Sequence, residues 1–137
     1  MRLDTYVNFA GRCAEAFRYY ETHLGGAIEM MTTHDQTPGS SRRPAEWQQA
    51  VLHARLRIGD AVLMGADIPN AEPMRSAYLT LRVDRDADAE RIYAALSDRG
   101  RILMPMAETF YASRFAQVQD QFGLNWMIMC ERPHPQP

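Results

Sequence analysis

Near its N-terminus the chain reads TYVNFAGRCAEAF (residues 5–17), where a strand-like run passes through a glycine turn into a helical pattern. The helical pattern continues to Leu24, and Gly25-Gly26 precedes a second apolar run. The same order returns later, with a strand pattern over residues 78–81, a helical pattern over 87–96 and then Gly100. The sequence therefore predicts a duplicated module. We expect a ligand cleft associated with its two copies.

Apolar residues recur at helical spacing in both copies. In the first helix they form one stripe, and Gly25 is expected to end the helix in a left-handed turn. In the second helix Asp84 or Asp86 is the expected N-terminal cap. The two predicted stripes are Cys13, Phe17, Tyr20 and Leu24, and Ala89, Ile92, Tyr93 and Leu96.

Residues 51–58 alternate as in a half-buried strand. Leu52, Ala54, Leu56 and Ile58 are expected on the buried face, and Val51, His53, Arg55 and Arg57 on the other. Gly59-Asp60 predicts a tight turn into a strand over 61–64. Further strands are expected near 101–104, 114–119 and 125–130. The order is βαβββ twice, which predicts an α+β fold.

We expect one domain built from two modules, approximately residues 1–67 and 76–131. The polar connection 33–48 contains a predicted helical turn at 44–47, and long connections of this kind often form lids or partner contacts. The proline-containing segment 68–75 is the expected linker, and the tail 132–137 is expected to be disordered.

Composition excludes several classes of function. The net charge is −2 over 137 residues and no basic stripe is present, so we expect no nucleic acid partner. The chain has no lysine, which removes Schiff-base chemistry and the phosphate-loop lysine. We expect no membrane contact and a cytoplasmic location, because neither a signal-like nor a membrane-spanning segment is seen. Cys13 and Cys130 are expected as reduced thiols.

Three motifs together resemble the glyoxalase/bleomycin-resistance/extradiol-dioxygenase superfamily of vicinal oxygen chelate proteins, and within it the PhnB-like branch. They are residues 6–26, residues 53–64 and the segment DQFGLNW at 120–126. The resemblance implies curved sheets enclosing a cleft, commonly in a homodimer. In the enzymes of this superfamily four side chains hold a divalent metal.

The resemblance also places the four metal-ligand positions on this chain. They fall at Asp4 or Thr5, Met64, Tyr78 and Met127. Thioethers bind hard divalent ions poorly, and a stable site needs about three protein ligands. We therefore expect neither a metal nor another cofactor.

His53 is the sharpest candidate for a ligand contact, because it shares a strand face with Arg55 and could orient a ligand or act as a base. A structural role or a dimer contact is the alternative. The other histidines, at 23, 34 and 134, are expected to be solvated. Arg114 could gate the cleft or form an ion pair with Asp120 or Glu108. The predicted ligand-binding residues are Tyr6, Asn8, His53, Arg55, Met64, Tyr78, Phe110 and Met127.

The repeat relates Tyr6 and Asn8 of the first module to Tyr78 and Thr80 of the second. These side chains could bind a ligand or bind one another. The strand methionines suit either an adaptable pocket or core filling. These features predict a metal-independent protein that binds a small molecule and could sequester a hydrophobic or aromatic compound. The alternative is a lyase, isomerase or dioxygenase with a non-standard metal set, in which His53 joins Asp4 or Glu108. A vestigial cleft is the third hypothesis.

Overall fold

A computed structural model describes residues 1–38 and 44–133 of the chain. The predicted tail beyond 133, with His134, and residues 39–43 of the long connection lie outside the described residues. The chain divides into two compact units, Met1–Glu72 (unit 1) and Pro73–Pro137 (unit 2).

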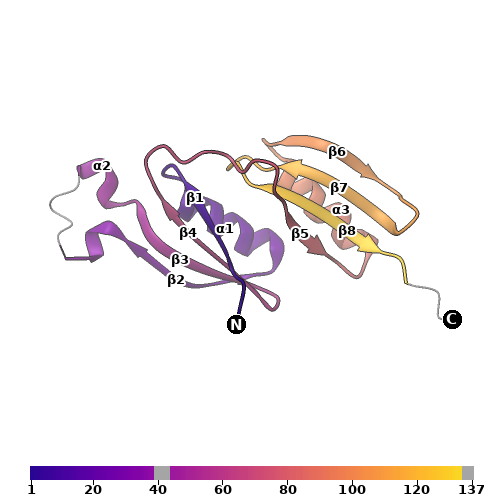
Figure 1. The fold of residues 1–137 in the computed structure, drawn as a ribbon, viewed down its shortest axis with the longest axis horizontal. Coiled ribbons are helices and arrows are strands. Elements are labelled where there is room, and N and C mark those ends of the chain that lie inside the picture. The colour runs from indigo at the N-terminus through magenta and orange to yellow at the C-terminus, as the bar shows by residue number, and fades with distance from the viewer. Residues whose placement is uncertain (39–43, 134–137) are drawn as a thin grey trace. The chain divides into compact units, whose positions relative to one another are not determined.

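Each unit has the predicted βαβββ order (Figure 1). Unit 1 contains β1 (Thr5–Phe9), α1 (Cys13–Leu24), β2 (Ala27–Thr33), the 3-10 turn η1 (His34–Gln36), α2 (Ala45–Gln48), β3 (Val51–Ile58) and β4 (Ala61–Asp67). Unit 2 contains β5 (Leu79–Arg82), α3 (Asp86–Ser97), β6 (Arg101–Ala107), β7 (Ala112–Gln119) and β8 (Asn125–Glu131). The strand orders are β1-β4-β3-β2 and β5-β8-β7-β6. In each sheet the first strand runs parallel to the last, which confirms the α+β class.

Helix α1 covers one face of the sheet in unit 1. Its Phe17 meets Phe9 edge to face, with ring centroids 6.0 Å apart. A Cβ atom at Gly65 would lie 2.8 Å from the Phe17 ring, so only glycine lets the helix approach β4 this closely. Val7 and Phe9 are buried, whereas Tyr6 and Asn8 are exposed. The side chains of β1 thus alternate between the helix and the opposite face, which we call the open face.

The alternation predicted for β3 is right at Ala54 and Leu56, which are fully buried, and wrong at the start of the strand. Val51 is fully buried and Leu52 is 38% exposed, the reverse of the prediction. The pairing with β2 shifts register here, because Thr32 pairs with His53 and Thr33 with Val51. This β-bulge reverses the facing of side chains at one end of the strand. It turns Leu52 toward the open face.

The two helices differ in how they are capped. Gly25 ends α1 with φ 70°, in the left-handed conformation predicted for it. The cap predicted for α3 is wrong, because Arg85 occupies that position and no side chain caps the helix. Asp86 instead accepts a hydrogen bond from the Ser113 hydroxyl of β7 and forms an ion pair with Arg114 at 3.4 Å.

Of the two roles predicted for Arg114, the ion pair is present, but its partners differ from those predicted. Its guanidinium contacts Asp86 and Glu90 on α3 rather than Asp120 or Glu108. Asp120 is buried, and it accepts hydrogen bonds from two backbone N–H groups of its own turn and from the indole of Trp126 at 2.7 Å. Its carboxylate therefore stabilises the β7–β8 turn.

Asp67 connects three elements of unit 1. One carboxylate oxygen accepts the N–H groups of Gly11 at 2.9 Å and Cys13 at 3.0 Å, and the other accepts the N–H of Val51 at 2.9 Å. Buried backbone N–H groups need partners. Because Asp67 supplies all three, it fixes the first turn of α1 and the start of β3 against the end of β4.

None of the helices in the described part of the chain is long and apolar enough to span a membrane.

Replacing Asp67 by Asn should lower the free energy of unfolding by about 2 to 3 kcal/mol, because one oxygen cannot serve three donors and the new amide faces a backbone N–H. Urea denaturation measures the loss. Asp60→Asn, in the exposed β3–β4 turn, is the matched control and should change stability little. Equal losses in the two variants would contradict the role given to Asp67.

Burial, and secondly the charge of Asp67, raises the pKa of the Cys13 thiol from 9.0 to about 12. The folded chain thus keeps a proton that the unfolded chain loses near pH 9, so this contribution is present below that pH and is lost as pH rises toward 12. Urea denaturation at about pH 8 and about pH 10.5 should show a larger loss of stability for the native protein than for Cys13→Ala. Parallel losses would show that the thiol contributes nothing to the pH dependence.

Candidate functional site

The open face of unit 1 carries a row of side chains that crosses the whole sheet. Strand register places Tyr6 of β1 beside Met64 of β4, Met64 beside Arg55 of β3, and Arg55 beside Met30 of β2. Paired residues point to the same face of a sheet. Three of the predicted ligand-binding residues therefore share one row on the open face.

Tyr6 also contacts His53. Their rings stack with centroids 5.8 Å apart and an interplanar angle of 27°, and the hydroxyl lies 3.4 Å from His53 Nδ1. Burial is the largest cause of a raised pKa of the Tyr6 hydroxyl. The phenol is therefore neutral at physiological pH and can donate or accept one hydrogen bond.

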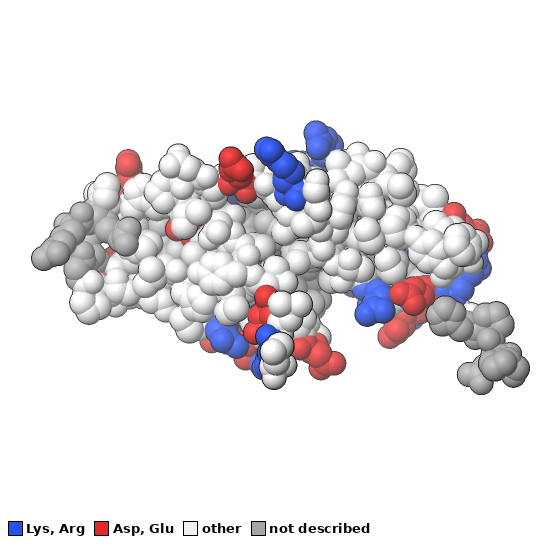
Figure 2. Space-filling model, in the orientation of Figure 1, with Lys and Arg blue, Asp and Glu red and all other residues white. Residues whose placement is uncertain are grey.

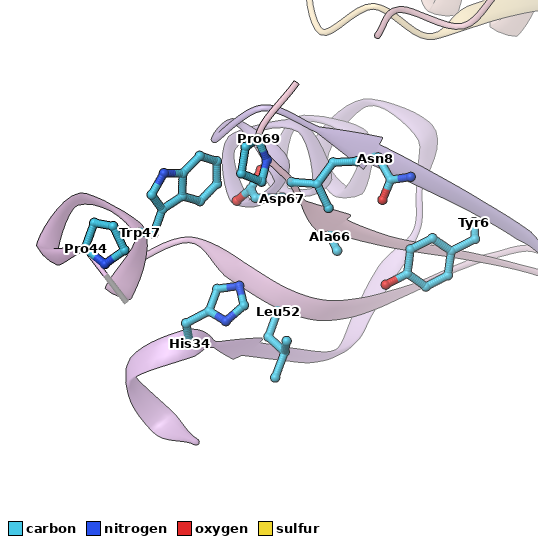
Figure 3. A pocket seen from close by; sticks show the side chains of 10 residues that line it. Tyr6, Asn8, His34, Pro44, Trp47, Leu52, Ala66, Asp67 and Pro69 are labelled. Carbon is cyan, nitrogen blue, oxygen red and sulfur yellow. The ribbon is translucent and has the colours of Figure 1, made fainter. Parts of the chain in front are cut away.

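A pocket of about 450 Å³ opens on this face at the end where β1 and β4 terminate (Figure 3). Its size lies in the range of small-molecule sites. Of the eight predicted residues it takes in Tyr6 and Asn8. The lining residues within the described part of the chain are Tyr6, Asn8, His34, Pro44, Trp47, Leu52, Ala66, Asp67, Ile68 and Pro69.

Local structure explains how the apolar wall forms. Residues 44–47 make the predicted turn, in which the Trp47 N–H donates to the Pro44 carbonyl at 2.9 Å. This turn directs the indole into the pocket beside Pro69, and Leu52 reaches the pocket through the β3 bulge (Figure 3). The predicted alternation of β3 placed the Leu52 side chain against α1, so Leu52 was not expected in the pocket.

His34 is the polar lining residue whose environment the sequence interpretation predicted wrongly. It was expected to be solvated, yet it is only 6% exposed. The sequence held a signal at this point, since Thr33 and Gln36 have capping-box spacing. Both hydrogen bonds of that capping box are present. They stabilise the 3-10 turn η1, from which the His34 side chain points toward the pocket.

The remaining predicted residues lie in unit 2. Phe110 is 93% exposed in the β6–β7 connection, and Tyr78 directly precedes β5. Met127 of β8 pairs with Thr80 of β5 and with Gln117 of β7. Gln117 in turn pairs with Met104 of β6, so unit 2 has a row equivalent to that of unit 1.

The positions implied for a metal do not form a suitable donor set. In unit 1 the register places Thr5 beside Leu63 and Tyr6 beside Met64, and Asp4 forms an ion pair with Arg2 at 3.6 Å. A thioether and a phenol are poor ligands for hard divalent ions. Within residues 1–38 and 44–133, no three His, Cys, Asp or Glu side chains cluster in a way that could hold a metal ion.

Charges on the visible face are mixed in sign. Figure 2 shows acidic and basic side chains next to one another rather than in separate areas. Ion pairs among the described residues include Arg57 with Glu29 at 3.0 Å. Mixed charges of this kind create no strong single-sign field on that face.

Comparison with known proteins gives one consistent result. The sequence model of the Glyoxalase/Bleomycin resistance protein/Dioxygenase superfamily matches residues 2–128. Protein YjdN of Escherichia coli is 31% identical and aligns over 98% of this chain and 99% of its own. The crystal structure of protein PA1353 from Pseudomonas aeruginosa is 37% identical, covers 97% of this chain and 99% of its own, and has a TM-score of 0.86. The PhnB protein from Bacillus cereus, at 18% identity, shares the fold with a TM-score of 0.81 over 95% of this chain and 99% of its own.

Proposed function

Because the chain belongs to the Glyoxalase/Bleomycin resistance protein/Dioxygenase superfamily, we propose that it binds a small organic molecule in the pocket of unit 1 and needs no metal ion to do so. The family expected from the sequence is confirmed by this membership.

The observation that carries the proposal is the composition of the pocket. Apolar side chains from three separate segments form most of its wall, and a small number of polar groups converge on it. Sites for small molecules have this character, since apolar walls supply affinity and a few polar groups fix orientation. Trp47 offers a large flat surface, and the hydroxyl of Tyr6 points into the pocket (Figure 3).

The other predicted residues extend the site in the proposal. His53 holds Tyr6 by stacking, while Arg55 and Met64 continue the same row beyond the pocket. Methionine side chains adapt their shape to apolar ligands. Tyr78, Phe110 and Met127 remain proposed ligand contacts of unit 2.

Metal independence follows from donor chemistry. Three of the four positions implied for a metal, Met64, Tyr78 and Met127, offer thioether and phenol groups, which suit hard divalent ions poorly. The fourth, Asp4 or Thr5, supplies at most one carboxylate, and a stable site needs about three protein ligands. We propose sequestration of a hydrophobic or aromatic compound as the activity.

A homodimer is part of the same proposal. Phe110 exposes 93% of its surface. Among the aromatic rings of the described residues, the ring that it contacts is that of Tyr111, in a T-shaped arrangement. A second copy of the chain could cover such an aromatic group. Light scattering coupled to size exclusion chromatography measures the mass, and the proposal expects that of two chains.

A two-ring probe, 2-naphthol, should raise the melting temperature of the native protein, because a ligand that prefers the folded state stabilises it. Trp47→Ala should weaken binding about tenfold by removing the flat wall of the pocket. Glu46→Ala, an exposed position on the same turn and outside the lining, is the control and should bind as the native protein does.

The same titration after treatment with a chelator tests metal independence and should give an unchanged affinity. Metal analysis of protein purified without chelator provides the second measurement. Near-stoichiometric nickel, zinc, iron or manganese would contradict metal independence and favour the lyase, isomerase or dioxygenase alternative. A melting temperature that no concentration of 2-naphthol changes would contradict ligand binding in this pocket.

A further inference from the structure

His34 presents an unpaired imidazole to the pocket of unit 1. The residue is 94% buried, given its exposure of 6%, and its ring makes no hydrogen bond with another described residue. Among the described residues, no side-chain nitrogen or oxygen is both sealed from solvent and unpaired. The ring nitrogens are therefore accessible from the pocket, toward which the ring points (Figure 3).

Hydrogen bonds fix the backbone that carries this ring. The His34 N–H donates to the Ala50 carbonyl at 3.0 Å, and its carbonyl accepts the N–H of Thr37 at 3.2 Å and the Thr37 hydroxyl at 2.8 Å. Asp35 accepts a hydrogen bond from the Gln49 amide at 2.9 Å, which connects η1 to the end of α2. A side chain positioned in advance loses little conformational entropy when it binds.

The remaining lining defines the shape of a suitable ligand. A cavity of about 150 Å³ holds one benzene molecule, so a pocket of about 450 Å³ has room for two or three rings. The indole of Trp47 provides a surface on which such rings can stack. The hydroxyl of Tyr6 and the amide of Asn8 lie on the opposite side from Trp47 (Figure 3).

Charge limits the ligand further. Asp67 is the one charged residue among the described lining residues, and its carboxylate already accepts three backbone hydrogen bonds. Its negative charge disfavours an anion in the pocket. Arg55, the cation of the row on the open face, is not part of the lining.

Resting on the function proposed above, we infer that the ligand is an uncharged molecule of two or three flat rings bearing a hydroxyl or ketone oxygen, which hydrogen-bonds to His34. Neutral histidine has one donor and one acceptor nitrogen, so it can pair with either group. His34 is then the histidine of the pocket lining that selects the ligand, and His53 remains a proposed residue of the extended site.

Three probes of one shape separate the contributions. Naphthalene has no oxygen, 2-naphthol has one neutral hydroxyl, and 2-naphthoate carries a negative charge. Their affinities are measured by quenching of tryptophan fluorescence at neutral pH for the native protein and for His34→Phe, which keeps a flat ring without hydrogen-bonding nitrogens. His34→Gln retains a donor and an acceptor, and His23→Phe makes the same exchange on α1, outside the pocket lining.

The native protein should bind 2-naphthol about tenfold more tightly than naphthalene, the value of one hydrogen bond to a buried group. His34→Phe should remove this preference while naphthalene binding persists, which also shows that the variant is folded. His34→Gln should retain part of the preference, and His23→Phe all of it.

Two results would overturn the inference while leaving ligand binding intact. One is a preference for 2-naphthol that survives in His34→Phe, and the other is tighter binding of 2-naphthoate than of 2-naphthol. Failure of all three probes to bind the native protein would overturn the proposed function together with the inference.

Discussion

The backbone N–H groups of Gly11, Cys13 and Val51 converge on one point of unit 1, and those of Cys13 and Val51 are buried where water cannot reach them. The carboxylate of Asp67 is their common acceptor, at distances of 2.9 to 3.0 Å. This requirement sets the entry of the chain into α1 and the start of β3. The same contacts help to form the pocket. Asp67 is part of the pocket wall, and the β-bulge that exposes Leu52 begins directly after Val51, whose N–H binds Asp67. Fold and site in unit 1 therefore depend on one carboxylate.

Much of the fold could be predicted because its signals are local. Near neighbours in the chain determine the left-handed Gly25, the bounds of β3 and the α1 stripe. These predictions are confirmed for Gly25, for β3 and for Cys13, Phe17 and Tyr20 of the stripe, whereas Leu24 is only half-buried. The facing of Leu52 could not be predicted, since it depends on a register shift against β2. The absent side-chain cap on α3 has a similar cause, because Ser113 and Arg114 of a distant strand engage Asp86.

The candidate site was predicted in part for the same reason. Tyr6 and Asn8 follow from alternation along one strand, and both line the pocket. His34 lies in a polar connection, where hydrophobic periodicity predicts neither a helix nor a strand. In that connection the capping box of Thr33 and Gln36 marks the turn at His34 as ordered. Its burial depends on Ala50, far along the chain, whose carbonyl binds the His34 N–H. Capping-box spacing within a long connection is therefore the local signal that marks a position such as His34 as ordered.

The two units have the same strand order but different connections between their second and third strands. In unit 1 residues 34–50 lie between β2 and β3, whereas in unit 2 residues 108–111 join β6 to β7. The longer connection contributes three of the lining residues, His34, Pro44 and Trp47. Most of its sequence can therefore drift during evolution without disturbing strand pairing, since loops tolerate exchange better than the elements they join. Part of the pocket wall in unit 1 is therefore built by a connection that has no counterpart of similar length in unit 2.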